Sequence, residues 1–165
     1  MRVTAVIQAR AGSSRLPGKV LLDLGGRPVL SWVVRAAQEA AEVDEVVIAT
    51  SDRDLDDPVE EAARELGVAC VRGSEDDVLS RFVLALDTHP ADAVVRLTAD
   101  CPLLDPGLID AVVALWRAVP ERDYVSTVLV RTLPRGLDVE VVKAEALRRV
   151  ARTAQALSAM CSSAR

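Results

Sequence analysis

The sequence predicts an α/β fold in which a mostly parallel sheet carries helices on both of its faces. Short apolar runs of strand length alternate along the chain with stretches whose apolar residues recur at helical spacing. Polar residues follow the C-terminal ends of four of the runs. The length of 165 residues suits one domain with a substantial core, which we place at residues 1–150, followed by an atypical tail at 151–165.

Apolar runs bounded by turn residues predict the strands. The first, Val3–Ile7, is apolar throughout, as in strands that are buried on both faces. Later runs are similar in length and are rich in valine, which favours strands over helices. In chain order, strands are expected at residues 3–7, 46–50, 68–71, 93–97, 124–128 and 137–142.

Capping signals predict the helices between these strands. A helix begins at Pro28, after a turn that contains Gly25-Gly26, because proline fits a first helical turn. Asp57-Pro58 and Asp105-Pro106 each pair a capping residue with a proline, and Gly67 ends the helix that the first pair begins. Helices are therefore expected from residue 28 onward and at 57–66, 75–86 and 105–119.

Composition restricts the class of protein. The formal net charge of -5 and an aromatic content of 2% argue against nucleic-acid binding, which needs a basic face or stacking rings. Apolar runs stay well below eighteen residues, and the first strand begins at once, so we expect neither a membrane span nor a signal peptide. The three cysteines lack metal-ligand spacing, which favours reduced thiols and a cytoplasmic location.

The segment Gln8–Lys19 predicts a loop that grips phosphate. Small residues let backbone N–H groups approach an anion closely, and three cations within the loop neutralise it. The loop is not a P-loop, because five residues separate Gly12 from Gly18 and Val20 follows Lys19. The Rossmann fingerprint G-x-G-x-x-G is also absent after the first strand.

Polar residues that follow the strands are expected to share one cleft, because ligands of open α/β sheets bind beyond the carboxyl ends of the strands. The four polar segments are Gln8–Lys19, Ser51-Asp52, Arg72–Ser74 and Thr98–Asp100. The plain alternative for the loop cations is a solvated surface loop.

Four ordered segments of the sequence carry a resemblance to a known family. They are Gln8–Leu30, Arg72–Leu79, Leu97–Leu103 and Gly136–Glu140. Together they resemble the cytidylyltransferase family, which includes the CMP-Kdo and CMP-sialic acid synthetases. The resemblance covers residues 3 to about 142 and is closest to the branch for spore coat polysaccharide synthesis. It implies a three-layer α/β/α sandwich with a Rossmann-like sheet of the nucleotide-diphospho-sugar transferase type.

The resemblance implies transfer of CMP from CTP to an acidic sugar or a similar oxygen acceptor, with release of pyrophosphate. Such chemistry needs alignment and charge neutralisation more than covalent catalysis. We assign the triphosphate to the loop cations and to the donors between them. The cations are Arg10, Arg15 and Lys19, and the donors are Gly12, Ser13 and Ser14. CTP selectivity rests on the family likeness.

Asp100 is the expected ligand of Mg²⁺, because a hard cation prefers carboxylate oxygen and retains waters while it bridges phosphates. The plainer interpretation is a turn or capping aspartate before Pro102. Asp138 is the candidate for a second metal ligand, and Glu140 is expected on the same face of the same strand. A surface acid is an equally good interpretation of Asp138.

The resemblance also places the base and the acceptor. Cytosine is expected between Ala9-Arg10 and the segment Ser74–Arg81. Gln8, Ser74 and Arg81 are expected among the nucleotide-binding residues. The acids at 75–77 also fit the plainer role of complementing a helix dipole. Arg131 and Arg135 are candidates for binding the acceptor, although exposed loop charges are an equal interpretation.

The C-terminal segment departs from the family pattern. Relatives continue beyond the last strand and often form a homodimer, whereas residues 151–165 are rich in Ala, Ser and Arg and show no clear apolar face. An incomplete acceptor site is therefore one expectation. Two other functions stay open: a nucleotide-sugar transferase or glycosyltransferase of the same fold, and a non-catalytic protein that binds a nucleotide or a partner.

Overall fold

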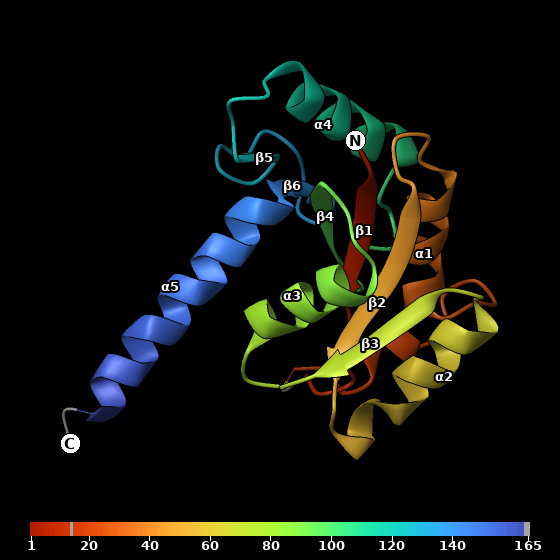
Figure 1. Cartoon of the computed structure of the whole chain (residues 1–165). Helices are drawn as coiled ribbons and strands as arrows, with labels where there is room; N and C mark the ends of the chain where they lie inside the picture. Colours follow the sequence, from red (N-terminus) through yellow and green to blue (C-terminus); the bar gives the residue numbers. More distant parts are fainter. Residues whose placement is uncertain (14, 164–165) are drawn as a thin grey trace.

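A computed structural model describes the backbone of residues 1–13 and 15–163, and the side chains of these residues as far as 154. Over this part of the chain, six strands form one sheet in the order β3-β2-β1-β4-β6-β5 (Figure 1). The strands are β1 (Val3–Gln8), β2 (Glu45–Ser51), β3 (Ala69–Gly73), β4 (Ala93–Thr98), β5 (Tyr124–Ser126) and β6 (Glu140–Lys143). The first four are mutually parallel, and β6 is antiparallel to β4 and β5.

Helices cover both faces of the sheet, which confirms the predicted three-layer α/β/α sandwich. The helices are α1 (Val29–Glu39), α2 (Asp57–Glu65), α3 (Val78–Thr88), α4 (Pro106–Ala118) and α5 (Ala144–Ser163). Residues of α1, α2 and α4 share one buried cluster with alternate positions of β1. Those of α3 and the start of α5 share a second cluster on the opposite face. In Figure 1, α5 then extends away from the body of the molecule.

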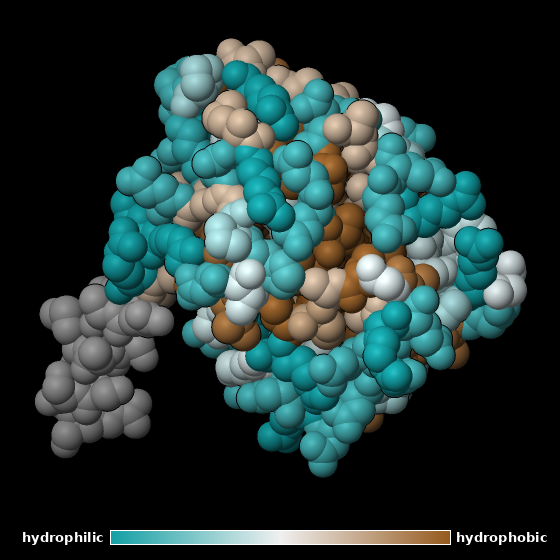
Figure 2. All heavy atoms as spheres, turned by 45° about the vertical axis from the view of Figure 1, so that its right-hand side comes forward, coloured by the Kyte–Doolittle hydropathy of each residue, from teal (hydrophilic) through white to brown (hydrophobic). Residues whose placement is uncertain are grey.

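Strand β1 lies at the centre of the sheet, between β2 and β4. Val3, Ala5 and Ile7 pack into one apolar cluster, whereas Val6 packs into the other. Burial on both faces explains why this strand is continuously apolar instead of alternating. On the outside, hydrophilic residues cover most of the face in Figure 2, and hydrophobic residues show in a band across its middle.

Several element boundaries differ from the sequence-based expectation. Helix α3 begins at Val78 instead of residue 75, because the Asp77 carboxylate accepts a hydrogen bond from the Ser80 amide at 2.9 Å and caps the helix. Strand β6 begins at Glu140 instead of 137, and β5 ends at Ser126 instead of 128. Between them, the Thr127 hydroxyl donates to Leu137 O at 3.1 Å and accepts from the Val139 amide at 3.0 Å.

Residues 151–163, the segment set apart as a tail in the sequence, continue helix α5. Ala151 is 8% exposed, so the helix retains a buried position beyond residue 150. Among the described residues, no helix has both the length and the apolar character needed to cross a bilayer.

Candidate functional site

The loops after β1, β2, β3 and β4 meet at the carboxyl edge of the sheet, as the sequence predicted. Backbone hydrogen bonds join them: the Ala9 amide donates to Ala49 O at 3.1 Å, and the Ala99 amide donates to Gln8 O at 3.1 Å. The Asp52 amide donates to Gly73 O at 2.9 Å. The four polar segments therefore lie side by side on one edge.

Residues 9–19 form what we call the phosphate loop. The Gly18 amide donates to Ala11 O at 2.8 Å and closes the loop upon itself. Gly18 has φ 67°, a left-handed conformation that glycine adopts without strain. Lys19 follows directly and begins a short 3-10 turn, so the backbone turn fixes where the lysine starts.

Lys19 and Asp100, two predicted residues that are 81 positions apart, form an ion pair in which Lys19 Nζ donates to Asp100 Oδ2. Partial burial pushes the pKa of Asp100 up, but the hydrogen bond and charge of Lys19 outweigh burial and hold that pKa below its usual range. Asp100 is thus held as a carboxylate, the form that binds a cation.

A hollow of about 180 Å³ lies above the ends of β1 and β4. It brings together four of the predicted site residues, Gln8, Arg10, Lys19 and Asp100, and adds Arg96 from β4. Ala9 is 1% exposed and forms part of the apolar core beneath the loop. Three cations face one carboxylate here, so the hollow has a net positive charge suited to an anionic ligand.

Arg81, predicted to bind the nucleotide, is 1% exposed. Its Nη1 donates to Ser74 O at 2.5 Å and to Glu75 O at 3.2 Å. Nε and Nη2 have no hydrogen-bond partner among the described residues. Burial, and next the like charge of Arg10, lower the pKa of Arg81. An anion placed beside these two arginines would satisfy the open donors and relieve the repulsion.

The remaining predicted residues of the phosphate loop lie away from this hollow or outside the description. Gly12 lines a second, larger pocket. Ser13 Oγ accepts from the Leu16 amide at 3.4 Å, a contact within the loop itself. Arg15 is exposed, and Ser14 lies outside the described residues.

Asp138 does not lie on a strand, which corrects the expectation that it shares a strand face with Glu140. It precedes β6, and its carboxylate accepts from Arg131 Nη1 at 2.7 Å and Nη2 at 3.3 Å. Asp138 and Arg131, predicted separately as metal and acceptor ligands, therefore bind each other. Arg135 is exposed, and neither arginine lines the 180 Å³ hollow.

Asp56 is a site residue that sequence reasoning missed. It is 3% exposed, and Oδ1 accepts from the Ala11 amide at 2.6 Å. Oδ2 accepts from the Ser51 amide at 3.2 Å and also from the Ser51 hydroxyl. The carboxylate thus ties the phosphate loop to the end of β2. The sequence signal at this point is the capping pattern Asp57-Pro58, which does not involve Asp56.

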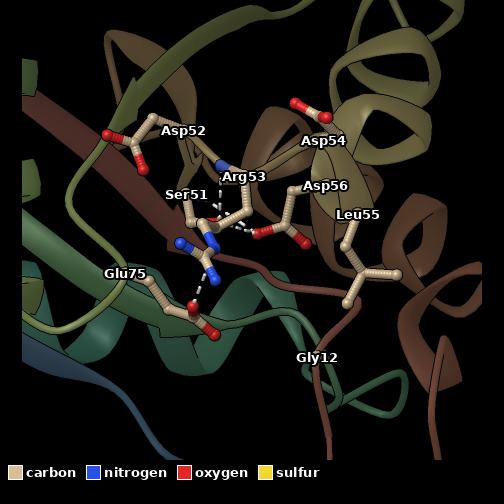
Figure 3. A pocket seen from close by; sticks show the side chains of 8 residues that line it. All are labelled: Gly12, Ser51, Asp52, Arg53, Asp54, Leu55, Asp56 and Glu75. Atoms are coloured by element: carbon tan, nitrogen blue, oxygen red, sulfur yellow. Dashed lines mark hydrogen bonds and ion pairs between the residues drawn. The ribbon is translucent and has the colours of Figure 1, made fainter.

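The second pocket lies on the other side of the phosphate loop and has a volume of about 670 Å³. Figure 3 shows Asp56 and Ser51 at its wall, with Arg53 reaching toward Glu75. Arg53 Nε lies 3.5 Å from Glu75 Oε2. Four carboxylates and one arginine line the pocket: Asp52, Asp54, Asp56, Glu75 and Arg53. This pocket is acidic and suits a ligand group that donates hydrogen bonds.

Arg96 was also missed, although its signal was visible as a lone charge within the apolar run Ala93–Leu97. Its Nη1 donates to Glu140 Oε1, and Nη2 donates to Gln8 Oε1 at 3.2 Å. Tyr124 donates its phenolic hydrogen to Glu140 Oε2 at 2.6 Å. A charged network therefore crosses β1, β4, β6 and β5 below the hollow.

Comparison with known proteins gives a consistent result. The model of a family described as cytidylyltransferase matches residues 4–162. The spore coat polysaccharide biosynthesis protein SpsF of Bacillus subtilis is 38% identical over 152 residues, which cover 89% of this chain and 61% of SpsF. A 3-deoxy-manno-octulosonate cytidylyltransferase of Synechococcus elongatus is 38% identical over 121 residues, 72% of this chain and 48% of that protein.

Solved structures agree. A cytidylyltransferase from Leptospira borgpetersenii superposes with a TM-score of 0.88 at 35% identity, and the aligned part covers 92% of this chain and 64% of the Leptospira chain. A CMP:2-keto-3-deoxy-manno-octonic acid synthetase complexed with CTP gives 0.77 at 25% identity, covering 92% and 78%. The chain spans 62% and 61% of the length of two curated relatives that it matches.

Proposed function

Because this chain belongs to the cytidylyltransferase family, we propose that it transfers CMP from CTP to an oxygen acceptor and releases pyrophosphate. The observation that carries the proposal is the pairing of Lys19 with Asp100 in a positively charged hollow at the carboxyl edge of the sheet. This arrangement supplies the two things that nucleotidyl transfer needs, a fixed cation for phosphate and a carboxylate for a metal ion.

In the proposed reaction, an acceptor oxygen attacks the α-phosphorus of CTP. The bond between that phosphorus and the bridging oxygen to the β-phosphorus breaks, pyrophosphate leaves with the bonding pair, and the acceptor hydroxyl loses its proton. Lys19 neutralises charge on the leaving group, and Arg10 binds phosphate oxygens through its planar fork. The unpartnered donors of buried Arg81 support an anion on that side of the phosphate loop.

Asp100 is the residue that would hold Mg²⁺. Mg²⁺ keeps several waters and binds through one or two carboxylates together with substrate phosphates, so a single carboxylate beside the phosphate loop fits the ion. The bound ion would supply charge neutralisation on the phosphates of CTP. Asp100 is kept ionised by Lys19, and Lys19 is free to turn to phosphate once another cation takes its place.

The acidic pocket supports cytosine as the base. Cytosine presents a 4-amino group that donates hydrogen bonds, and carboxylates such as Glu75 and Asp52 accept them. Uracil presents an oxygen at the same position and would face carboxylates without a donor. We therefore place the base in the 670 Å³ pocket, which Gly12 of the phosphate loop borders.

Calorimetric titration with CTP, UTP, ATP and GTP, with and without Mg²⁺, tests the proposal without an acceptor. We expect Mg²⁺-dependent binding of CTP and at least about tenfold weaker binding of UTP. D100N should remove the Mg²⁺ dependence. The matched control is D92N, because Asp92 is an exposed acid near the amino end of β4 that pairs with the N-terminal amine. Absence of nucleotide binding to the wild-type chain would contradict the proposal.

A further inference from the structure

Arg96 occupies an unusual place for a charged residue. It lies within β4, directly opposite Glu140 on β6 and Val6 on β1. Its two neighbours along the strand, Val95 and Leu97, are fully buried on the other face. The Arg96 side chain itself is 38% exposed and lines the 180 Å³ hollow together with Lys19 and Asp100. A charge inside a central strand is costly unless it is paired, and Arg96 is both paired and open to the hollow.

The guanidinium of Arg96 is held on two sides. Gln8 Oε1 accepts from Nη2 at 3.2 Å, and Glu140 Oε1 accepts from Nη1. Glu140 is 17% exposed, and its second oxygen is taken by the Tyr124 hydroxyl at 2.6 Å. The network fixes the plane of the guanidinium before any ligand arrives.

Part of the guanidinium nevertheless stays open. A guanidinium has five N–H donors, and the hydrogen bonds with described residues use only two of them. Arg96 is also unlike Arg10 and Lys19, because it does not belong to the phosphate loop. It lies on β4, between β1 and β6, whereas the phosphate loop follows β1 and the acidic pocket adjoins the end of β2.

We propose that Arg96 binds a carboxylate of the acceptor and so determines which acceptors are used, an inference that rests on the proposed nucleotidyl transfer. The phosphate loop and the acidic pocket take the nucleotide on the β1–β2–β3 side. The acceptor must reach the α-phosphorus from next to Lys19 and Asp100, and Arg96 lines the same hollow from β4, which the strand order separates from β2 and β3 by β1. Glu140 and Tyr124 are positioning residues that hold the guanidinium plane.

The charge at the site favours a monoanion. Arginine matches the planar, bidentate geometry of a carboxylate. The Glu140 carboxylate already pairs with Arg96. A doubly charged phosphate bound to Arg96 would therefore be repelled by Glu140 more strongly than a singly charged carboxylate would be. The hydroxyls of a sugar acid would find oxygen partners in the same network.

Calorimetry on the full chain tests this assignment. The chain is first saturated with Mg²⁺ and with a CTP analogue in which a methylene group joins the α- and β-phosphates. This analogue cannot release pyrophosphate, so the acceptor binds without turnover. The probes are 3-deoxy-manno-octulosonate and glucuronate, each paired with an uncharged counterpart, the octulosonate methyl ester and glucose. We expect the wild-type chain to prefer each acid, and R96M to weaken binding of the acids about tenfold or more while leaving the neutral sugars unchanged.

Further variants separate a binding role from a structural one. R96K keeps the positive charge but lacks the planar guanidinium, so it should recover part of the preference for acids that R96M loses. E140Q removes a negative charge next to Arg96 and should bind the acids more tightly than the wild-type chain. R35M is the matched control, because Arg35 pairs with Glu39 on the surface of α1. Equal binding of the acids to wild-type and R96M, or a wild-type chain that binds no acid more tightly than its counterpart, would overturn the inference. Failure to bind the CTP analogue would instead count against the proposed function.

Discussion

Replacing Asp56 with asparagine should destabilise the protein and loosen the phosphate loop at the same time. Asp56 is 3% exposed, and its two oxygens accept from the Ala11 amide at 2.6 Å, from the Ser51 amide at 3.2 Å and from the Ser51 hydroxyl. An asparagine keeps one accepting oxygen and replaces the other with an NH₂ group that can only donate. The NH₂ group of the asparagine would therefore face a backbone amide that also donates, either that of Ala11 or that of Ser51.

The expected loss follows from these contacts. A buried amide left without an acceptor costs about 1–3 kcal/mol, and the surviving hydrogen bond loses its charge assistance, which adds about 1 kcal/mol. D56N should thus lower the free energy of unfolding by about 2–4 kcal/mol, measured by urea denaturation monitored through circular dichroism. Amide exchange should also speed up at the Ala11 or the Ser51 amide, whichever faces the new NH₂ group, because that amide loses its acceptor at residue 56.

Asp54 provides the control for this experiment. It lies two residues away in the same 3-10 turn, is exposed, and lines the same pocket as Asp56. D54N should change the free energy of unfolding by less than about 0.5 kcal/mol. If D56N behaved like D54N, the carboxylate would not be the tie between the phosphate loop and β2, and the reasoning would fail.

Two further predictions concern the loop backbone and the thiols. G18A should lower the free energy of unfolding by about 1–2 kcal/mol because of the positive φ alone, since nothing lies within 4 Å of the added methyl group. It should also weaken CTP binding. The control G67A, with φ 68° and equally open surroundings, should lower the free energy of unfolding by as much and leave CTP affinity unchanged. Burial, then the nearby charge of Glu60, raises the pKa of the Cys70 thiol to about 11. Its alkylation by iodoacetamide, followed by peptide mapping, should be about 100-fold slower than that of a free cysteine at pH 8 and should rise with pH as the thiolate fraction grows; a rate that levels off near pH 8.5 would contradict this.

Most of the fold could be predicted from the sequence because the central strands are recognisable as continuous apolar runs. A strand such as β1, apolar at every position, has few alternatives, and the proline and glycine signals placed the helices within a few residues. The errors fell where a side chain replaces a backbone partner. The Thr127 amide still donates to Val139 O at 3.1 Å, but the Val139 amide donates to the Thr127 hydroxyl instead of to a backbone carbonyl, and no periodicity reveals such a contact.

The candidate site was predicted where chemistry is local in sequence. Lys19 and Asp100 were expected in one cleft because each lies in a polar segment that follows a predicted strand, but the ion pair between them was not predicted. Asp56 could not, because its role depends on burial against a loop 45 residues away. Asp138 was expected to bind a metal as a second carboxylate on a late strand. Its partner in the structure, Arg131, comes from the same loop, so the contact depends on the path of that loop.

The central position of β1 has a consequence for synthesis on the ribosome. One edge of β1 pairs with β2, but the other edge pairs with β4, in the register Val3↔Ala93. At about 5–20 residues per second, the first strand emerges roughly 5–20 seconds before its second neighbour does. During that interval an apolar strand has an open edge, which is the kind of surface that pairs with other chains. Slower translation between the two strands would prolong the exposure, so the yield of folded protein should depend on translation rate even where its final stability does not.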